Sequence, residues 1–290
     1  MRELHHRGYS VFYADPSNLS ASPSGITVKT RRAAVLDQAP FFFFHEEETL
    51  PIDRFRLVWI RKDPPVDAAY LYMTQILSLA GPRTAILNSP QALRDWNEKL
   101  IILNFPKWIP PTLVTSDKHE LAGFVEKHLV AVLKPLAGFA GQGVRRIFFK
   151  QSEEMREQID SVTHGGTLPV MAQVFFENVR LGEKRVFVGD GRVLGSFLKI
   201  PQDGGFLTNP DRGSRLATTS LTAREKKICA AIGVFLRKHG VFFAGLDLID
   251  GHLTEINITS PGLLWEWNEI ENRSHEKTII DLVEKRFLRR

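Results

Sequence analysis

The sequence predicts an α/β protein with two domains, the first built on a parallel sheet and the second of α+β type. Its 290 residues suffice for two domains at roughly 150 residues each. Hydrophobic residues make up 43% of the chain and charged residues 24%, an ordinary globular composition that excludes a disordered protein. In the N-terminal third, strand-like and helix-like apolar patterns alternate, and such alternation indicates a parallel sheet.

The predicted elements of the first domain, residues 1–97, come from apolar runs and from the helical spacing of apolar residues. We expect strands at residues 9–14, 55–60 and 84–87, and helices at residues 66–79 and 90–100. Residues 41–44 are four consecutive phenylalanines, and we expect their rings to pack in the core. Pro106, Pro110 and Pro111 mark a connection in the second domain, residues 98–290.

Cap signals and apolar runs predict the elements of the second domain. The predicted strands are residues 130–134, 144–149, 241–249 and 253–258, with further strands between residues 168 and 200. Helices are expected at residues 117–128 and 222–239, and over the C-terminal residues 276–290. Thr222 and Glu225 form a capping-box pattern, and Gly240 ends that helix.

A glycine-rich loop, residues 138–143, lies between two predicted strands. Glycines allow backbone N–H groups to approach phosphate oxygens closely, and Lys134 at the end of the preceding strand is placed to neutralise a phosphate. No Gly-Lys-Ser/Thr follows, which excludes a Walker A loop, and the strand that follows excludes a dinucleotide fingerprint. A plain flexible hairpin is the alternative to a phosphate-binding flap.

Three oxygen-bearing side chains, Asp247, Glu255 and Asn257, suit a hard cation such as Mg²⁺. Glu255 and Asn257 are two residues apart in a predicted strand and therefore share a face. A two-residue turn at Asp250 and Gly251 places Glu255 on the face opposite Asp247, whereas a three-residue loop pairs Asp247 with Glu255. We predict the three-residue loop, because a metal site requires that pairing; a solvated sheet face is the alternative.

Charge and composition limit the other function classes. Lys and Arg number 38 against 33 Asp and Glu, a net charge of +5, but the basic residues are spread along the chain without an RNA-binding, zinc-finger or basic-zipper motif. We therefore expect no nucleic-acid partner, and a basic cleft for an anionic small molecule fits the charge equally well. No apolar run approaches the ~18 residues of a membrane span. Cys229 is the single cysteine, which favours a reducing compartment, and Gly-x-Ser-x-Gly is absent.

Ordered blocks of residues along nearly the whole chain match a known family. They are residues 61–67 with Tyr70 and Tyr72, 88–100, 133–136, 171–173, 182–185, 245–247 and 253–261. In this order they resemble the bacterial glutathione synthetases of the ATP-grasp superfamily. The resemblance implies an N-terminal substrate domain and an ATP-grasp domain with two α+β subdomains, a flap-bearing lid at residues 98–172 and a metal-binding part at residues 173–290. This chain begins inside the family's first helix, so its parallel sheet is expected to lack the usual first strand.

The resemblance also implies roles for matching residues. Arg185 and Lys199 are expected to be catalytic, steadying an acyl phosphate and the incoming carboxylate. The expected ATP-binding residues are Lys99, Lys134, Gly138, Gly141, Gly143, Gln173, Phe175, Phe176 and Glu183. The expected substrate-binding residues are Arg61, Asp63, Asn209 and Ser260, and the expected metal ligands are Asp247, Glu255 and Asn257.

The activity that the resemblance implies is an ATP-dependent ligation. It joins the carboxylate of γ-glutamylcysteine to the amine of glycine through an acyl phosphate, giving glutathione, ADP and phosphate. Two Mg²⁺ ions, for which Mn²⁺ can substitute, a cytoplasmic location and a homo-oligomer are implied with it. Leu207 and Trp265 stand where the family has other residues. Ligation of a different peptide or amino acid, and ATP binding without ligation, therefore remain alternatives.

Overall fold

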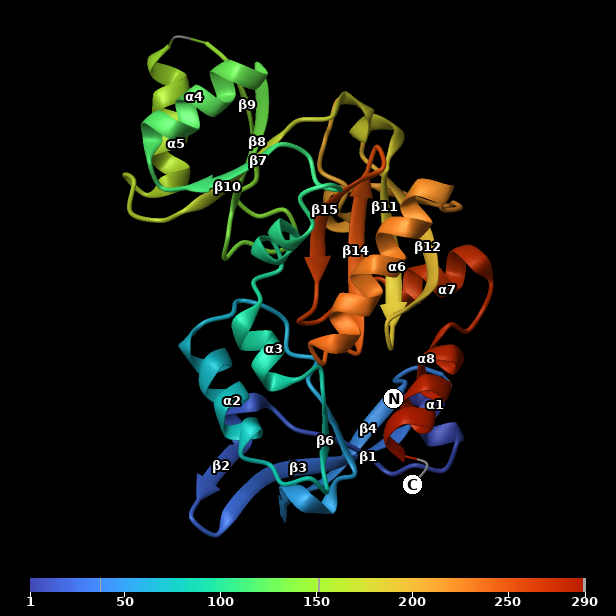
Figure 1. Cartoon of the computed structure of the whole chain (residues 1–290). Helices are drawn as coiled ribbons and strands as arrows, with labels where there is room; N and C mark the ends of the chain where they lie inside the picture. The colour runs from blue at the N-terminus through green and yellow to red at the C-terminus, as the bar shows by residue number, and fades with distance from the viewer. Residues whose placement is uncertain (37, 151, 289–290) are drawn as a thin grey trace.

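A computed structural model describes residues 1–36, 38–150 and 152–288 and shows three layers of structure stacked along the molecule (Figure 1). The N-terminal domain holds two sheets. Its antiparallel sheet consists of β1 (Val11–Tyr13), β2 (Leu19–Ser22), β3 (Gly25–Val35) and β4 (Phe42–Pro51), with β3 pairing with the other three. Its parallel sheet consists of β5 (Leu57–Trp59) and β6 (Ala85–Leu87). The helices are α1 (Arg2–His6), α2 (Ala68–Ser78) and α3 (Pro90–Asp95). The predicted parallel sheet is confirmed as the pair β5 and β6, but the antiparallel sheet is a difference, since residues 19–51 were not predicted to form strands.

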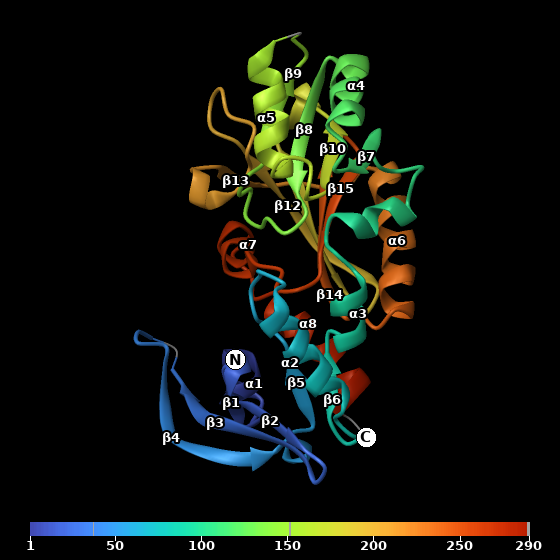
Figure 2. The same ribbon diagram turned by 90° about the vertical axis from the view of Figure 1, so that its left-hand side faces the viewer.

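The phenylalanine run at residues 41–44 does not lie in the core, contrary to our prediction. Phe41, Phe42 and Phe43 are 48%, 45% and 49% exposed. The ring of Phe41 contacts the exposed Trp265 at 6.4 Å and that of Phe43 contacts His45 at 5.5 Å, while Phe44 stacks on Tyr13 at 5.2 Å. β4 pairs with β3 alone among the described strands, and the β3–β4 hairpin projects from the body of the molecule (Figure 2). Because no sheet or helix layer of the described chain covers the end of this hairpin, Phe41, Phe42 and Phe43 stay exposed there.

The lid is an antiparallel sheet covered on one face by two helices. Its strands, in the order β7-β10-β8-β9, are β7 (Thr112–Thr115), β10 (Val170–Val174), β8 (Val130–Pro135) and β9 (Arg145–Phe148). The helices α4 (Lys118–His128) and α5 (Glu153–Thr163) bury Leu121, Val125 and Ile159 against it. The Asp117 side chain caps α4 by accepting from the backbone N–H groups of His119 and Glu120. The predicted subdomain boundary at residue 172 lies within β10.

The third layer is a five-stranded antiparallel sheet with helices on both faces (Figures 1 and 2). Its order is β13 (Arg215–Thr218), β12 (Arg192–Ile200), β11 (Glu183–Gly189), β14 (Phe243–Ile249) and β15 (His252–Asn257). The helix α6 (Ala223–Lys238) starts at the predicted capping box of Thr222 and Glu225, which is confirmed. The helices α7 (Leu264–Glu271) and α8 (Glu276–Val283) pack on the other face, where Trp267 is buried.

Short elements complete the chain. Short 3₁₀ helices lie at Pro16–Asn18, Ile52–Arg54, Leu100–Asn104, Glu177–Leu181 and Pro210–Arg212, and a π-helical turn at Glu284–Leu288 follows α8. The predicted C-terminal helix is therefore present over residues 276–283, while residues 289–290 lie outside the described part of the chain. Within the described residues, every helix is too short or too polar to cross a membrane.

Asn88 connects the N-terminal domain to the five-stranded sheet. It directly follows β6 and is only 3% exposed. Its Nδ2 donates to the carbonyls of Phe243 and Ile258 at 2.8 and 2.7 Å, and its Oδ1 accepts from the N–H groups of Phe242 and Phe243 at 2.8 and 2.9 Å. One side chain thus holds the start of β14 and the residue after β15.

Replacing this side chain should destabilise the protein strongly. We expect Asn88→Ala to lower the free energy of unfolding by about 3–5 kcal/mol, because four buried backbone groups lose their partner. Urea unfolding followed by circular dichroism measures the change. Asn104→Ala is the matched control, since exposed Asn104 donates one hydrogen bond, to the Ile101 carbonyl. Equal stability of the two variants would contradict the role of Asn88.

Candidate active site

A cleft lies between the lid sheet and the five-stranded sheet, and most of the predicted site residues line it. Those lining the cleft are Lys99, Lys134, Gly138, Gly141, Gln173, Phe175, Phe176, Glu183, Arg185, Lys199, Asn209, Asp247, Glu255 and Asn257. They come from both sheets and from the segment that enters the second domain. Gly143, Arg61, Asp63 and Ser260 do not line this cleft.

The two lysines approach the cleft from different segments. Lys99 is 4% exposed, and its Nζ donates to the Gly138 carbonyl at 2.5 Å and lies 3.2 Å from Oε1 of Glu255. Lys134 lies at the end of β8, and burial lowers the pKa of its ammonium, although the nearby carboxylates of Glu255 and Glu183 raise it. Among the described residues the Lys134 ammonium has no hydrogen-bond or ion-pair partner, so its charge is available to an anionic ligand.

The glycine-rich segment folds back over the cleft as a flap. Ala140 and Gly141 have φ angles of 50° and 71°, in the left-handed region that glycine adopts most easily. A Cβ atom on Gly141 would lie 2.9 Å from Oδ1 of Asn209, so the flap contacts the loop that follows β12. Gly143 instead faces Pro135. The flap and this loop therefore meet above the cleft.

The register of β14 and β15 brings the three predicted metal ligands together. Asp247 pairs with Glu255 and Gly245 with Asn257, which confirms the predicted pairing. The predicted three-residue loop is wrong, because Ile249 pairs with His252 across a two-residue turn. A β-bulge after the turn makes up the difference: Thr254 is the extra residue, and its hydroxyl donates to the Asp247 carbonyl at 3.2 Å.

Asp247 is the centre of a buried charge network. Arg185 donates to both of its carboxylate oxygens, at 2.8 and 3.0 Å, and Lys199 donates to it at 3.0 Å. Burial alone raises the pKa of Asp247, but Arg185 and Lys199 outweigh this effect and lower the pKa. Lys199 also lies 2.8 Å from Glu183, so the two predicted catalytic cations are both held by carboxylates facing the cleft.

The donor set at β14 and β15 fits a divalent cation. Asp247 and Glu255 supply carboxylate oxygens and Asn257 an amide oxygen, and such hard ligands suit Mg²⁺ together with substrate phosphates. The Nδ2 atom of Asn257 donates to Asp247 at 3.0 Å, which orients both side chains. No group of three His, Cys, Asp or Glu side chains with metal-binding geometry occurs among the described residues, so a cation here depends on the amide and on ligand oxygens.

The end of the cleft beside β10 is apolar and aromatic. Its walls include Val132, Val144, Phe175, Phe176, Val179 and Ile249. Phe176 stacks on His252 at 4.8 Å between ring centres. Phe206, in the loop after β12, also lines the cleft, and the guanidinium of Arg146 lies 4.9 Å from the ring of Phe175 and 5.3 Å from that of Phe206. Such flat apolar walls suit a planar base.

The predicted substrate-binding residues lie at three separate positions in the structure. Nη2 of Arg61 donates to the Pro261 carbonyl at 3.0 Å, and the Ser260 hydroxyl donates to the Arg61 carbonyl at 3.4 Å. Asn209 lies by the flap, while Asp63 is exposed. Arg61 and Ser260 thus join the N-terminal domain to the segment that follows β15.

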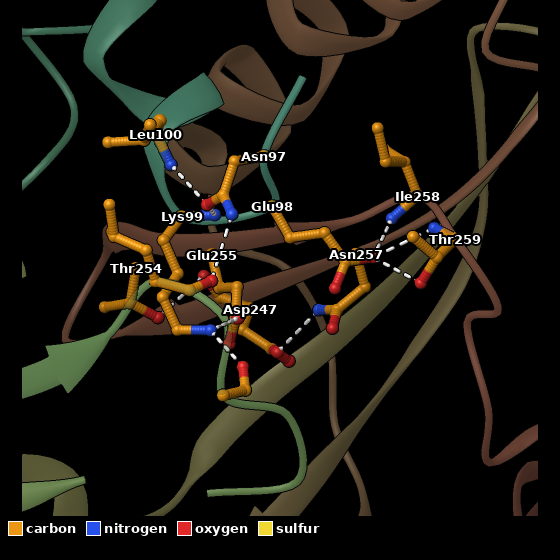
Figure 3. Close-up of polar contacts among 12 residues, drawn as sticks. Asn97, Glu98, Lys99, Leu100, Asp247, Thr254, Glu255, Asn257, Ile258 and Thr259 are labelled. Atoms are coloured by element: carbon orange, nitrogen blue, oxygen red, sulfur yellow. Dashed lines mark hydrogen bonds and ion pairs between the residues drawn. The ribbon is translucent and has the colours of Figure 1, made fainter. Parts of the chain in front are cut away.

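Sequence reasoning missed Asn97 and Glu98, which precede Lys99 (Figure 3). Asn97 accepts through Oδ1 from the N–H groups of Lys99 and Leu100, and its Nδ2 donates to the Leu136 carbonyl beside the flap. Glu98 accepts from Ile258 and Thr259. Their position directly before Lys99, a predicted ATP-binding residue, could have drawn attention to them. The neighbouring sequence does not show where their side chains point.

Two α+β subdomains that enclose a cleft lined by both lysines and carboxylates define the ATP-grasp class of ligases. Solved structures with this fold include the ATP-grasp ligase PsnB complexed with a precursor peptide and AMPPNP, at 16% identity over 97% of this chain and 91% of that chain, with a TM-score of 0.62. The D-cycloserine synthetase DcsG has 16% identity over 80% of this chain and 86% of that chain, with a TM-score of 0.61. At such identities the likeness concerns the fold.

The chain belongs to the prokaryotic glutathione synthetase family and is an ATP-dependent ligase. The N-terminal domain of that family matches residues 1–94, and its ATP-grasp domain matches residues 98–272. Glutathione synthetases from two Prochlorococcus marinus strains are similar along most of their length. The MED4 protein is 38% identical over 93% of this chain and 87% of the relative, and the MIT 9313 protein is 44% identical over 90% and 84%.

Proposed function

We propose that this protein joins the carboxylate of γ-glutamylcysteine to the amine of glycine, forming glutathione with conversion of ATP to ADP and phosphate. The observation that carries the proposal is that Lys99 and Lys134 line one cleft together with the oxygen-bearing side chains of Asp247, Glu255 and Asn257. Family membership and the named relatives support the particular substrates. Family membership also supports a cytoplasmic location and a homo-oligomer. Sedimentation velocity would test the oligomeric state.

The reaction proceeds in two steps that need little covalent chemistry from the protein. A carboxylate oxygen of the peptide attacks the γ-phosphorus of ATP, and ADP leaves. The glycine nitrogen then attacks the acyl carbon of the resulting acyl phosphate and loses a proton, and inorganic phosphate leaves. Lys99 and Lys134 offset the negative charge of the phosphates, which is where most of the catalysis of phosphoryl transfer arises.

The remaining groups act on the intermediate and on water. Arg185 and Lys199 are proposed to hold the acyl phosphate, since both cations reach into the cleft next to Asp247. The flap and the Phe206–Asn209 part of the opposite loop cover the cleft and exclude water, which would otherwise hydrolyse the acyl phosphate. Asp247, Glu255 and Asn257 would hold two Mg²⁺ ions, which supply further charge neutralisation at the phosphates when bound.

Phosphate release from ATP tests the proposed function. We expect release that requires both γ-glutamylcysteine and glycine, with glutathione as the product identified by mass spectrometry. Release that requires a different amine or peptide would overturn the proposed substrates. Such a difference is worth testing because Leu207, an apolar residue that lines the cleft, stands where the family has another residue. Thermal stabilisation by ATP without any turnover would overturn ligation itself.

Removal of divalent cations should stop the reaction reversibly. We expect excess EDTA to reduce glutathione formation to background, because the phosphates and the Asp247 and Glu255 carboxylates then repel one another without a cation between them. Added Mg²⁺ should restore the rate and Mn²⁺ should substitute for it. Undiminished turnover after dialysis against EDTA would contradict the metal assignment.

A further inference from the structure

Glu98 lines the cleft next to Lys99 and is hydrogen-bonded to the segment that leads to Ser260, and none of the steps above uses it. All three of its side-chain hydrogen bonds go to one oxygen, Oε1. That atom accepts from the Ile258 N–H at 2.7 Å, the Thr259 N–H at 2.9 Å and the Thr259 hydroxyl at 2.9 Å (Figure 3). A partly buried oxygen that accepts three hydrogen bonds is a directional anchor, and its loss leaves three donors without a partner.

The anchored segment leads directly to the N-terminal domain. Ile258 is also held from the other side, because Nδ2 of Asn88 donates to its carbonyl. Thr259 is 5% exposed, and both its N–H group and its hydroxyl donate to Glu98. The next two residues, Ser260 and Pro261, contact Arg61. Loss of the Glu98 carboxylate would therefore free Thr259 and the contacts to Arg61 while leaving β15 in place.

The neighbouring residue, Asn97, makes the opposite connection. Its Oδ1 accepts from the N–H groups of Lys99 and Leu100 at the start of the following 3₁₀ helix, and its Nδ2 donates to the Leu136 carbonyl beside the flap. Lys99 itself contacts Gly138 and Glu255. Two consecutive side chains thus reach to the two halves of the site: Asn97 to the nucleotide half and Glu98 to the half that contains Arg61 and Ser260.

We propose that Glu98 is a positioning residue that sets the place of the peptide-binding half relative to Lys99, acting as a hydrogen-bond acceptor and not through its charge. The inference rests on the proposed function for the identity of the peptide substrate. In the same way, Asn97 is a positioning residue for the ATP-binding half, because it holds the backbone of Lys99 and the Leu136 carbonyl. Because Gln also carries an Oε1 acceptor, the geometry requires that Glu98→Gln preserve the anchor and that Glu98→Ala remove it.

The test compares steady-state kinetics of three full-length variants. We expect Glu98→Ala to raise the KM for γ-glutamylcysteine at least about tenfold with the KM for ATP changed less than about threefold. Asn97→Ala should show the reverse pattern, and Glu98→Gln should stay within about threefold of the wild type in both constants. Equal effects of Glu98→Ala on both substrates, or a loss in Glu98→Gln as large as in Glu98→Ala, would overturn the proposal.

A second measurement does not depend on the substrates. Hydrogen exchange of the backbone amides of Ile258 and Thr259, followed by mass spectrometry, should accelerate at least about tenfold in Glu98→Ala and remain slow in Glu98→Gln. Unchanged protection in Glu98→Ala would refute the anchor even if the wild-type protein proved to ligate another peptide. Failure of the wild type to use γ-glutamylcysteine, with the exchange pattern as expected, would refute the proposed function alone.

Discussion

Replacement of Glu255 by Gln is expected to lower glutathione formation on the order of a thousandfold while leaving the fold stable. The amide keeps the size of the side chain and an acceptor for Lys99, which lies 3.2 Å from the carboxylate, but it removes one of two negative charges from the proposed cation site. Turnover at saturating Mg²⁺, ATP and peptide measures the effect. Thermal unfolding should shift by no more than a few degrees.

Two further variants test the same metal assignment. Glu47→Gln, on the exposed strand β4, is the matched control and should keep full activity, since Glu47 forms a surface ion pair with Arg31 at 3.7 Å. Asp247→Asn should lose turnover and also about 3–5 kcal/mol of stability, because Arg185 and Lys199 would be left without their buried partner. Activity near the wild-type level in Glu255→Gln would contradict the metal assignment.

Replacement of Lys134 by Met is expected to have opposite effects on ATP affinity and on stability. The affinity for ATP should fall about a hundredfold, since a cation beside the phosphates is lost. The free energy of unfolding should rise by about 1 kcal/mol, because Lys134 has no partner among the described residues and burial lowers the pKa of its ammonium. Calorimetric titration with a non-hydrolysable ATP analogue and urea unfolding measure the two quantities.

The control for this variant is Lys107→Met, at an exposed lysine outside the cleft. It should bind the ATP analogue as the wild type does. If Lys134→Met bound the analogue with unchanged affinity, Lys134 could not face the phosphates. If Lys134→Met instead lowered the free energy of unfolding, the ammonium of the wild-type Lys134 would have a stabilising partner that the described structure lacks.

Local sequence predicted much of the second domain, because the determinants there are short-range. Thr222 and Glu225 are three residues apart and form a capping box whatever the rest of the chain does. Glu255 and Asn257 share a sheet face because alternate residues of a strand always do. The order of the matching blocks then placed the lysines and the carboxylates in one cleft, as the structure has them.

Other features depend on contacts between distant segments and could not be read from local patterns. The pairing of Asp247 with Glu255 was correct for the wrong reason, since a bulge at Thr254 and not a longer loop produces it. The phenylalanines of residues 41–43 looked like core residues, but whether a hairpin is covered depends on what packs against it. Local patterns also could not show the partners of Asn88, which are more than 150 residues away.

The chain's own residue order therefore determined many of the elements, the cap of α6 and which side chains share a face, because these follow from backbone geometry over a few residues. It did not show the antiparallel sheet of β2, β3 and β4, because β2 and β4 are held by pairing with β3 and not by a marked apolar pattern of their own. Only the tertiary structure decided that Glu98 anchors Thr259, that Asn88 holds two strands, and that the flap meets the loop bearing Asn209. Each of these is a hydrogen bond or close contact across a long stretch of chain. Its partner is selected by the packing of whole sheets and not by the residues beside it.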